Sequence, residues 1–121
     1  MTKTRILTEF GIGSSLRRQD YTEAAARAVR DALWRNSINA AELFGFAKED
    51  MILDVEIGVH RPEAVDIAEI AKIFPYGQPT ITVTHGGLDI ARPEANPGSG
   101  KPTVIANAAI SVSFAMEPAD G

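Results

Sequence analysis

The chain is 121 residues long, which is the length of one ordinary domain with its own hydrophobic core. Apolar residues make up 45% of it and charged residues 23%, as in an average globular protein, and the formal net charge is −4. The acidic surplus disfavours nucleic-acid binding, no apolar run reaches the roughly 18 residues that span a bilayer, and the absence of cysteine excludes disulfides and thiol catalysis. We therefore expect a single domain over residues 1–121, located in the cytoplasm, with no nucleic-acid or membrane partner.

The first half of the chain predicts one strand and one long helix. Residues 4–10 carry β-branched and aromatic side chains and predict a strand that ends at the turn-forming stretch Gly11–Ser15. Asp20 and Glu23 have the spacing of a capping box and predict a helix that runs to about Asn36, with an alanine-rich apolar stripe. Residues 38–47 predict a short helical turn, anchored to the core by Leu43, Phe44 and Phe46.

The second half predicts three more strands and a second helix. Residues 51–60 alternate cleanly between apolar and polar side chains, and Pro62 then ends the strand. Asp66 begins a short helix that stops at Pro75-Tyr76-Gly77 and turns four side chains inward: Ile67, Ile70, Ile73 and Phe74. Residues 80–84 and 104–114 predict the remaining strands, and residues 92–102, rich in proline and glycine, predict a mobile loop.

This order, β-α-β-α-β-β, predicts a two-layer α/β (α+β) fold, with a four-stranded mixed sheet and two helices on one of its faces. The other face is expected to carry small and polar side chains, together with Arg5 and Glu9 or their alternates. Such a face either meets water or packs on copies of the chain around a symmetry axis. Because the domain is small and its last strand is long, we expect a homo-oligomer.

Two candidate ligand sites lie around the expected first helix. Gly11 and Gly13 form a Gly-x-Gly whose backbone N–H groups can bind an anion beside a helix N-terminus, or which simply makes a turn with positive φ. The third glycine and the acidic residue of a dinucleotide fingerprint are absent. Arg17 and Arg18 can bind a carboxylate or a phosphate, or can form ion pairs on a solvated surface.

Candidate proton-transfer groups lie on the expected strands. Glu9 and His60, with Asp54 and Glu56, can share one sheet face and transfer protons, or can be ordinary surface or interface residues. The chain has only two histidines and no spacing typical of metal ligands, so we predict no metal site and no cofactor.

Tyr76 and the segment His85-Gly86-Gly87 lie at the ends of elements, where binding groups gather. Beside two glycines, His85 can act as a base or a hydrogen-bond donor. In the alternative interpretation the glycines form a bulge that closes a hairpin, and His85 has no function.

The stretch Glu9-x-Gly11-x-Gly13, followed by Gln19-Asp20-x-Thr22-x-Ala24-Ala25-x-Arg27-Ala28-Val29-x-Asp31-Ala32, resembles the "Lin" family of uncharacterised conserved hypothetical bacterial proteins. Pro75-Tyr76-Gly77, Gly86-Gly87 and residues 104–109 extend the resemblance over nearly the whole chain. The hallmark of that family is Gly-x-Gly-x-Asp-x-His-Gly, and this chain has Ser15, Arg17 and Arg18 in place of the Asp, the His and the last Gly. The resemblance implies no established activity.

The order of elements also resembles the chorismate-mutase-like group, which includes trimeric reactive-intermediate deaminases. That resemblance implies a trimer or another multiple, with helices outside, sheet faces packed inward and small molecules bound between subunits.

We therefore expect a homo-oligomer that binds a small anionic or amide-containing metabolite between subunits, either as an enzyme or as a binding protein. Arg17 and Arg18 would bind the anion, and Glu9, His60 or His85 would move protons. One alternative is a non-catalytic partner or regulatory subunit of a relative whose motif is complete. Another is a structural subunit whose arginines form salt bridges at the interface.

Overall fold

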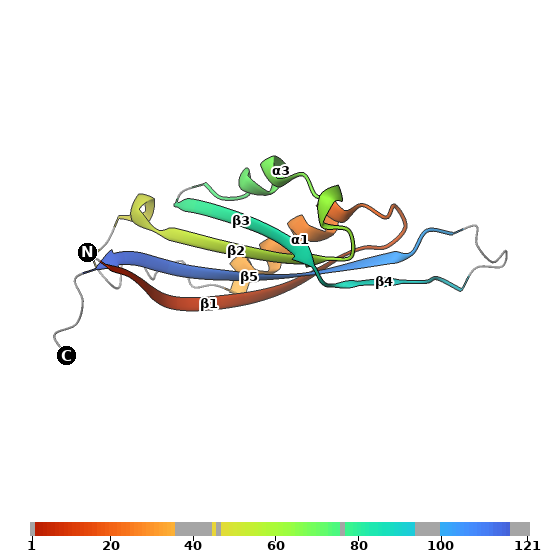
Figure 1. Cartoon of the computed structure of the whole chain (residues 1–121), viewed down its shortest axis with the longest axis horizontal. Helices are drawn as coiled ribbons and strands as arrows, with labels where there is room; N and C mark the ends of the chain where they lie inside the picture. The colour runs from red at the N-terminus through yellow and green to blue at the C-terminus, as the bar shows by residue number, and fades with distance from the viewer. Residues whose placement is uncertain (1, 36–44, 46, 76, 94–99, 117–121) are drawn as a thin grey trace.

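The computed structural model describes residues 2–35, 45, 47–75, 77–93 and 100–116. One sheet contains β1 (Thr2–Ser15), β2 (Ile52–Val59), β3 (Gln78–His85), β4 (Leu88–Ile90) and β5 (Thr103–Met116). The helices α1 (Tyr21–Arg35) and α3 (Ile67–Ala71) lie on one side of this sheet (Figure 1). Short 3-10 turns, η1 and η2, cover Lys48–Asp50 and Pro62–Ala64. The predicted two-layer α/β fold is confirmed, with one more strand than expected.

The sheet is mixed, as predicted. Its strand order is β1-β5-β2-β3, and only β2 and β3 are parallel among the described pairs. The extra strand, β4, pairs with residues 103–105 of β5, in line with β2, which pairs with residues 107–113. After β3 the chain therefore crosses the end of β2 to reach β5. With only three residues, β4 is too short to give a periodic signal in the sequence.

The predicted turn at Gly11–Ser15 is wrong, because β1 continues through it to Ser15. Neither Gly11 nor Gly13 has a positive φ. A Cβ atom at Gly13 would lie 2.3 Å from the backbone nitrogen of Ala28, and one at Gly11 would lie 2.1 Å from the carbonyl oxygen of Ala28. The two glycines therefore let the α1 backbone approach β1 closely, a need that only the tertiary structure reveals.

The helix α1 begins and packs much as the sequence predicts. The Asp20 carboxylate accepts a hydrogen bond from the backbone N–H of Glu23 at 2.9 Å, which confirms the cap. Glu23 does not complete the reciprocal box: its carboxylate pairs with Arg27, and the Asp20 N–H donates to the Ser15 hydroxyl instead. The predicted stripe is fully buried at Ala24, Ala25, Ala28, Val29 and Ala32, whereas Leu33 is half-buried.

The core lies between the helices and one face of the sheet. Along β2 the predicted alternation places four side chains in this core: Leu53, Val55, Ile57 and Val59. From β5 the core receives Val104, Ala106, Ala108, Ile110, Val112 and Phe114. In the short helix α3, Ile70 is buried as predicted, and Ile73 and Phe74 after it pack partly against the core, but Ile67 is 46% exposed. The cap of α3 is confirmed, because Asp66 accepts from the N–H groups of Ala68 and Glu69.

Some predicted features lie outside the described residues: Leu43, Phe44 and Phe46 of the helical turn, Tyr76, and residues 94–99 of the predicted loop. Among the described residues, no helix is long and apolar enough to cross a membrane.

Candidate functional site

The sheet face opposite the helices, here called the open face, has no described element over it (Figure 1). The strand registers align its side chains in rows across the sheet. One row runs Phe10, Ala109, Glu56 and Thr82, and the next runs Ile12, Asn107, Gly58 and Thr84. Phe10 on the outer strand β1 thus lies beside the small side chain of Ala109, and Gly58 on β2 has no side chain, which leaves a low area on the open face.

A hollow of about 390 Å³ lies at this low point and is here called the sheet hollow. The residues that line it come from four strands and the segment after β3: Phe10, Gly11, Glu56, Ile57, Gly58, Thr84, His85, Gly86, Asn107, Ala108 and Ala109. Its volume falls within the range of small-molecule sites. A second hollow of about 220 Å³ lies on the β1 side of Phe10, lined by Phe10, Gly11, Ile12 and Asp31.

Four polar residues give the sheet hollow its chemistry: Glu56, Asn107, Thr84 and His85, all of which are exposed. The Asn107 amide lies across Gly58, since a Cβ atom there would come within 2.4 Å of the Asn107 Oδ1 atom. Together these residues offer a carboxylate, an amide, a hydroxyl and an imidazole, which can both donate and accept hydrogen bonds. No Arg or Lys is among the described residues that line the hollow.

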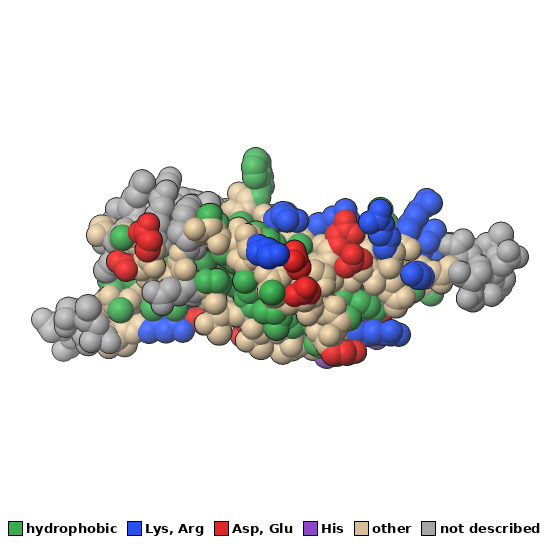
Figure 2. Space-filling view, turned by 90° about the horizontal axis from the view of Figure 1, so that it is seen from above, with side chains coloured by type: hydrophobic (Ala, Val, Ile, Leu, Met, Phe, Trp, Pro, Cys, Tyr) green, Lys and Arg blue, Asp and Glu red, His purple; other side chains and the backbone are tan. Residues whose placement is uncertain are grey.

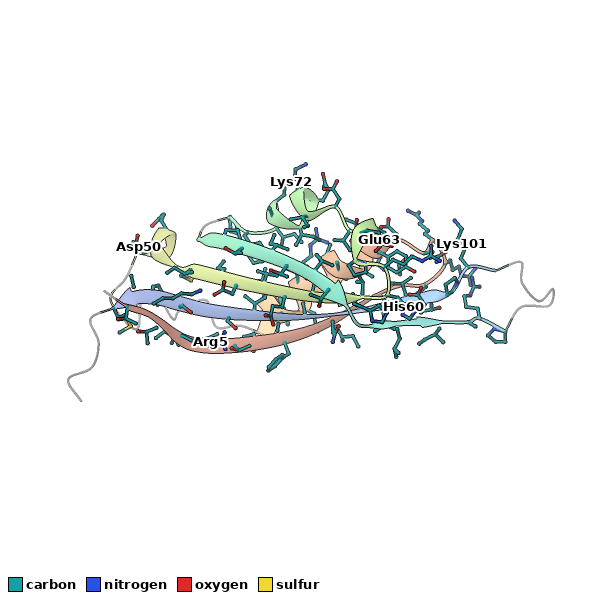
Figure 3. The ribbon with its side chains drawn as sticks, in the orientation of Figure 1. Arg5, Asp50, His60, Glu63, Lys72 and Lys101 are labelled. Carbon is teal, nitrogen blue, oxygen red and sulfur yellow. The ribbon has the colours of Figure 1, made fainter. Side chains whose placement is uncertain are left out.

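The two histidines of the chain meet beside the sheet hollow. Their ring centroids are 4.9 Å apart at an angle of 53°, and both side chains are exposed. His60 directly follows β2 and lies near the start of β4 (Figure 3). His85 ends β3. The structure therefore brings together two of the three residues expected to move protons.

The glycines after His85 carry the chain from β3 to β4. The Gly86 N–H donates to the Val59 carbonyl at 2.9 Å, and a Cβ atom at Gly86 would lie 3.0 Å from the Cα atom of Gly58. Gly87 has φ +58°, and a Cβ atom there would lie 2.1 Å from the Ile105 carbonyl oxygen. Because β3 and β4 do not pair with each other, the alternative of a bulge closing a hairpin is wrong.

Four exposed apolar side chains on the open face, of which Phe10 lines the sheet hollow, form what we call the apolar border. Phe10 is 66% exposed, Ile12 59%, Leu88 58% and Ile90 46%. Leu88 and Ile90 belong to the open face because they pair with Ile105 and Thr103 of β5. An exposed group of this kind is typical of a surface that contacts a ligand or another protein.

The other candidates from the sequence lie elsewhere. A register shift between Arg5 and Leu7 places Arg5 on the open face and Glu9 on the helix side of β1, so these two residues do not share a face. Gly13 is covered by α1. Arg17 and Arg18 are exposed in the bend between β1 and α1. Figure 2, a view onto the helix side, shows Lys and Arg side chains gathered toward the end of the molecule where Lys101 lies (Figure 3).

Sequence reasoning included Glu56 among the candidate proton-transfer groups. It did not include Asn107, Thr84, Phe10 or Ala109 in a site. Their meeting depends on the register between β1, β5 and β2, three strands that are far apart in the chain. The alternation along β2 and β5 indicates which side chains lie on the open face, but it carries no information about how the strands are aligned with each other.

One position of the degenerate motif, Ser15, has a structural role here. Ser15 is fully buried and its hydroxyl oxygen accepts the Asp20 N–H at 3.1 Å. Nearby, Gln19 has φ +51°, and its amide donates to the Tyr21 hydroxyl at 3.2 Å. The Tyr21 hydroxyl donates in turn to Asp89 of β4, and burial together with Asp89 raises the pKa of Tyr21.

The model of a conserved hypothetical protein family, Lin0512, matches residues 5–112. A crystal structure of an FtsZ-like protein of unknown function from Nostoc punctiforme superposes with a TM-score of 0.83. It is 33% identical in sequence, and the match covers 96% of this chain and 99% of that one. No curated protein matches the chain. Because the family model spans most of the sequence, the expected resemblance to the "Lin" family is confirmed, and the chain belongs to the Lin0512 family of conserved hypothetical proteins.

Proposed function

We propose that this chain is a small-molecule-binding protein that works as a homo-oligomer and binds its ligand in the sheet hollow. The observation that carries this proposal is the hollow itself, about 390 Å³ in volume, where Glu56, Asn107, Thr84 and His85 meet on an uncovered sheet face. A concave site with a few convergent polar groups and an apolar wall, here Phe10, is the usual form of a metabolite site.

The lining favours an amide-containing ligand over an anionic one. An anion needs positive charge or a set of N–H donors, and Arg17 and Arg18 are not among the residues of the sheet hollow. An amide presents N–H groups that the Glu56 carboxylate can accept, and a carbonyl oxygen that the Asn107 amide can bind. His85 lines the hollow and contacts His60, so it lies where it can exchange a proton with such a ligand.

The apolar border supports contact with a ligand or with another protein. Phe10, Ile12, Leu88 and Ile90 expose large apolar side chains, and the hollow that Phe10 lines is open rather than enclosed. A second copy of the chain bound beside the hollow would reduce the access of water to a bound ligand.

The test fills the sheet hollow without touching the core. Ala109→Phe adds a large side chain to the floor of the hollow, and Ala115→Phe makes the same change on the same strand and face, outside the hollow. Amide-containing metabolites would be screened against the wild type by ligand-observed NMR. We expect binding that Ala109→Phe abolishes and Ala115→Phe leaves unchanged; equal binding by all three proteins would refute the site.

A second candidate function, a non-catalytic partner subunit, is favoured by the state of the family motif. The Ser15 hydroxyl takes part in helix capping inside the fold, so the position where relatives carry Asp performs no surface chemistry here. Mixing this chain with a relative that retains the Asp and the His tests the idea. Mixed assemblies in native mass spectrometry would support it, and separate assemblies would exclude it.

A further inference from the structure

The two outer edges of the sheet differ in how their backbone groups are used. Along β1, the Ile12 N–H donates to the Asp31 carboxylate at 2.9 Å, and the Ser14 carbonyl accepts from the Arg27 guanidinium at 2.7 Å. Side chains of α1 thus occupy polar groups that another strand would need. Natural proteins protect an edge from further pairing in this way.

Within the described part of the chain, no comparable side-chain contact protects the edge at β3. Among the described residues, β3 pairs only with β2, so its outer backbone groups have no strand partner. Residues 80–84 contain no charged side chain, and the sequence alternates threonine with the β-branched Ile81 and Val83, both half-buried. Pro79 lacks an N–H group and limits pairing to the residues after it.

The sequence of β3 is complementary to itself. If two copies of β3 pair antiparallel about a two-fold axis at Thr82, then Thr82 faces its own copy, Thr80 faces Thr84, and Ile81 faces Val83. All the threonines then share the open face and all the apolar side chains share the core face. Threonine pairs and β-branched pairs are both favourable cross-strand neighbours.

We propose that a second copy of this chain binds at β3 in this antiparallel register and extends the sheet across a two-fold axis. The proposal deepens the proposed function, since it rests on the homo-oligomer stated there. It also adds a residue to the ligand site: Thr80 of the partner subunit would lie next to Thr84, at the β3 side of the sheet hollow. Each dimer would carry two such sites. A two-fold unit predicts a dimer or an assembly built from dimers, rather than a simple trimer.

Charge swapping at the axis tests the pairing. In the proposed dimer the two residues at position 82 are about 5 Å apart, so Thr82→Lys places two like charges together, and so does Thr82→Glu. We expect each variant alone to be monomeric in size-exclusion chromatography with light scattering, and an equimolar mixture of the two to form heterodimers. Ile12→Lys, which adds the same charge to the open face away from β3, is the control and should keep the wild-type assembly.

Several outcomes would overturn the proposal: a monomeric or trimeric wild type, a Thr82→Lys variant that stays associated, or a mixture that does not reassociate. Dissociation by Ile12→Lys but not by the changes at Thr82 would place the contact on the open face instead. Ligand binding is measured separately in each sample. A dimer that binds no ligand would refute the ligand site and leave the pairing intact, whereas a ligand-binding monomer would refute the pairing and leave the ligand site intact.

Discussion

The contact between β1 and α1 predicts that adding one methyl group at Gly13 destabilises the fold severely. The new Cβ atom of Gly13→Ala would lie 2.3 Å from the Ala28 nitrogen and 2.4 Å from the Ala24 carbonyl oxygen. Both are backbone atoms, so no side-chain rotation relieves the clash, and α1 must move away by about 1 Å. That movement also loosens the fully buried stripe of α1 around Val29 and Ala32.

The expected loss in the free energy of unfolding follows from the usual cost of overpacking a core, which is about 1–3 kcal/mol and occasionally more. A whole helix must shift, so we expect a loss near the upper end, ~3 kcal/mol. With a urea m-value of about 1–3 kcal/mol/M for a domain of this size, the unfolding midpoint should fall by ~1–3 M. Ser14→Ala, the next residue on the strand, adds no atom and serves as the control, with a shift below roughly 0.5 kcal/mol. If Gly13→Ala unfolded at the wild-type urea concentration, α1 would not be packed on β1 as described.

Two further changes probe the polar contacts around the start of α1. Asp20→Ala removes the hydrogen bond to the Glu23 N–H and should lower the free energy of unfolding by about 1 kcal/mol. Circular dichroism should then show a Tm lower by a few degrees, and an unchanged Tm would exclude this cap. Tyr21→Phe removes the hydrogen bond that Asp89 accepts from Tyr21. The other carboxylate oxygen of Asp89 is buried and has no partner among the described residues, so the free energy of unfolding should fall by about 1–3 kcal/mol. The pKa of Tyr21 is raised above its ordinary value of 10.0, so the folded state favours the protonated phenol. The stability that the protonated phenol contributes to the folded state is fully present below pH 10.0 and is lost as the pH rises above it. The urea midpoints measured at about pH 8 and about pH 11 should therefore differ more in the wild type than in Tyr21→Phe.

Features fixed by local periodicity were predictable from the sequence. The alternation of β2 gave the buried set from Leu53 to Val59, and the alanine stripe gave the buried side of α1. Asp20 and Asp66 marked the starts of both helices, because a short acidic side chain is one of the few that can satisfy the free N–H groups there.

Features that depend on contacts between distant segments were not predictable. Glycine weakens a strand and favours turns, so Gly11 and Gly13 predicted a turn, although the reason for both residues is the α1 backbone beside them. A bulge between Arg5 and Leu7 places Arg5 and Glu9 on opposite faces of the sheet, and no local sequence pattern predicts this bulge. The sheet hollow arises from the register that sets Phe10 beside Ala109 and Glu56, and a single sequence does not encode that register visibly.

Native mass spectrometry of the purified protein, beside its Ala109→Phe variant, tests the central claim most directly. The wild type is expected to appear as an assembly with an even number of subunits, carrying the extra mass of a small molecule that Ala109→Phe no longer retains. A bare monomer, or the same extra mass in both proteins, would contradict a ligand site in the sheet hollow.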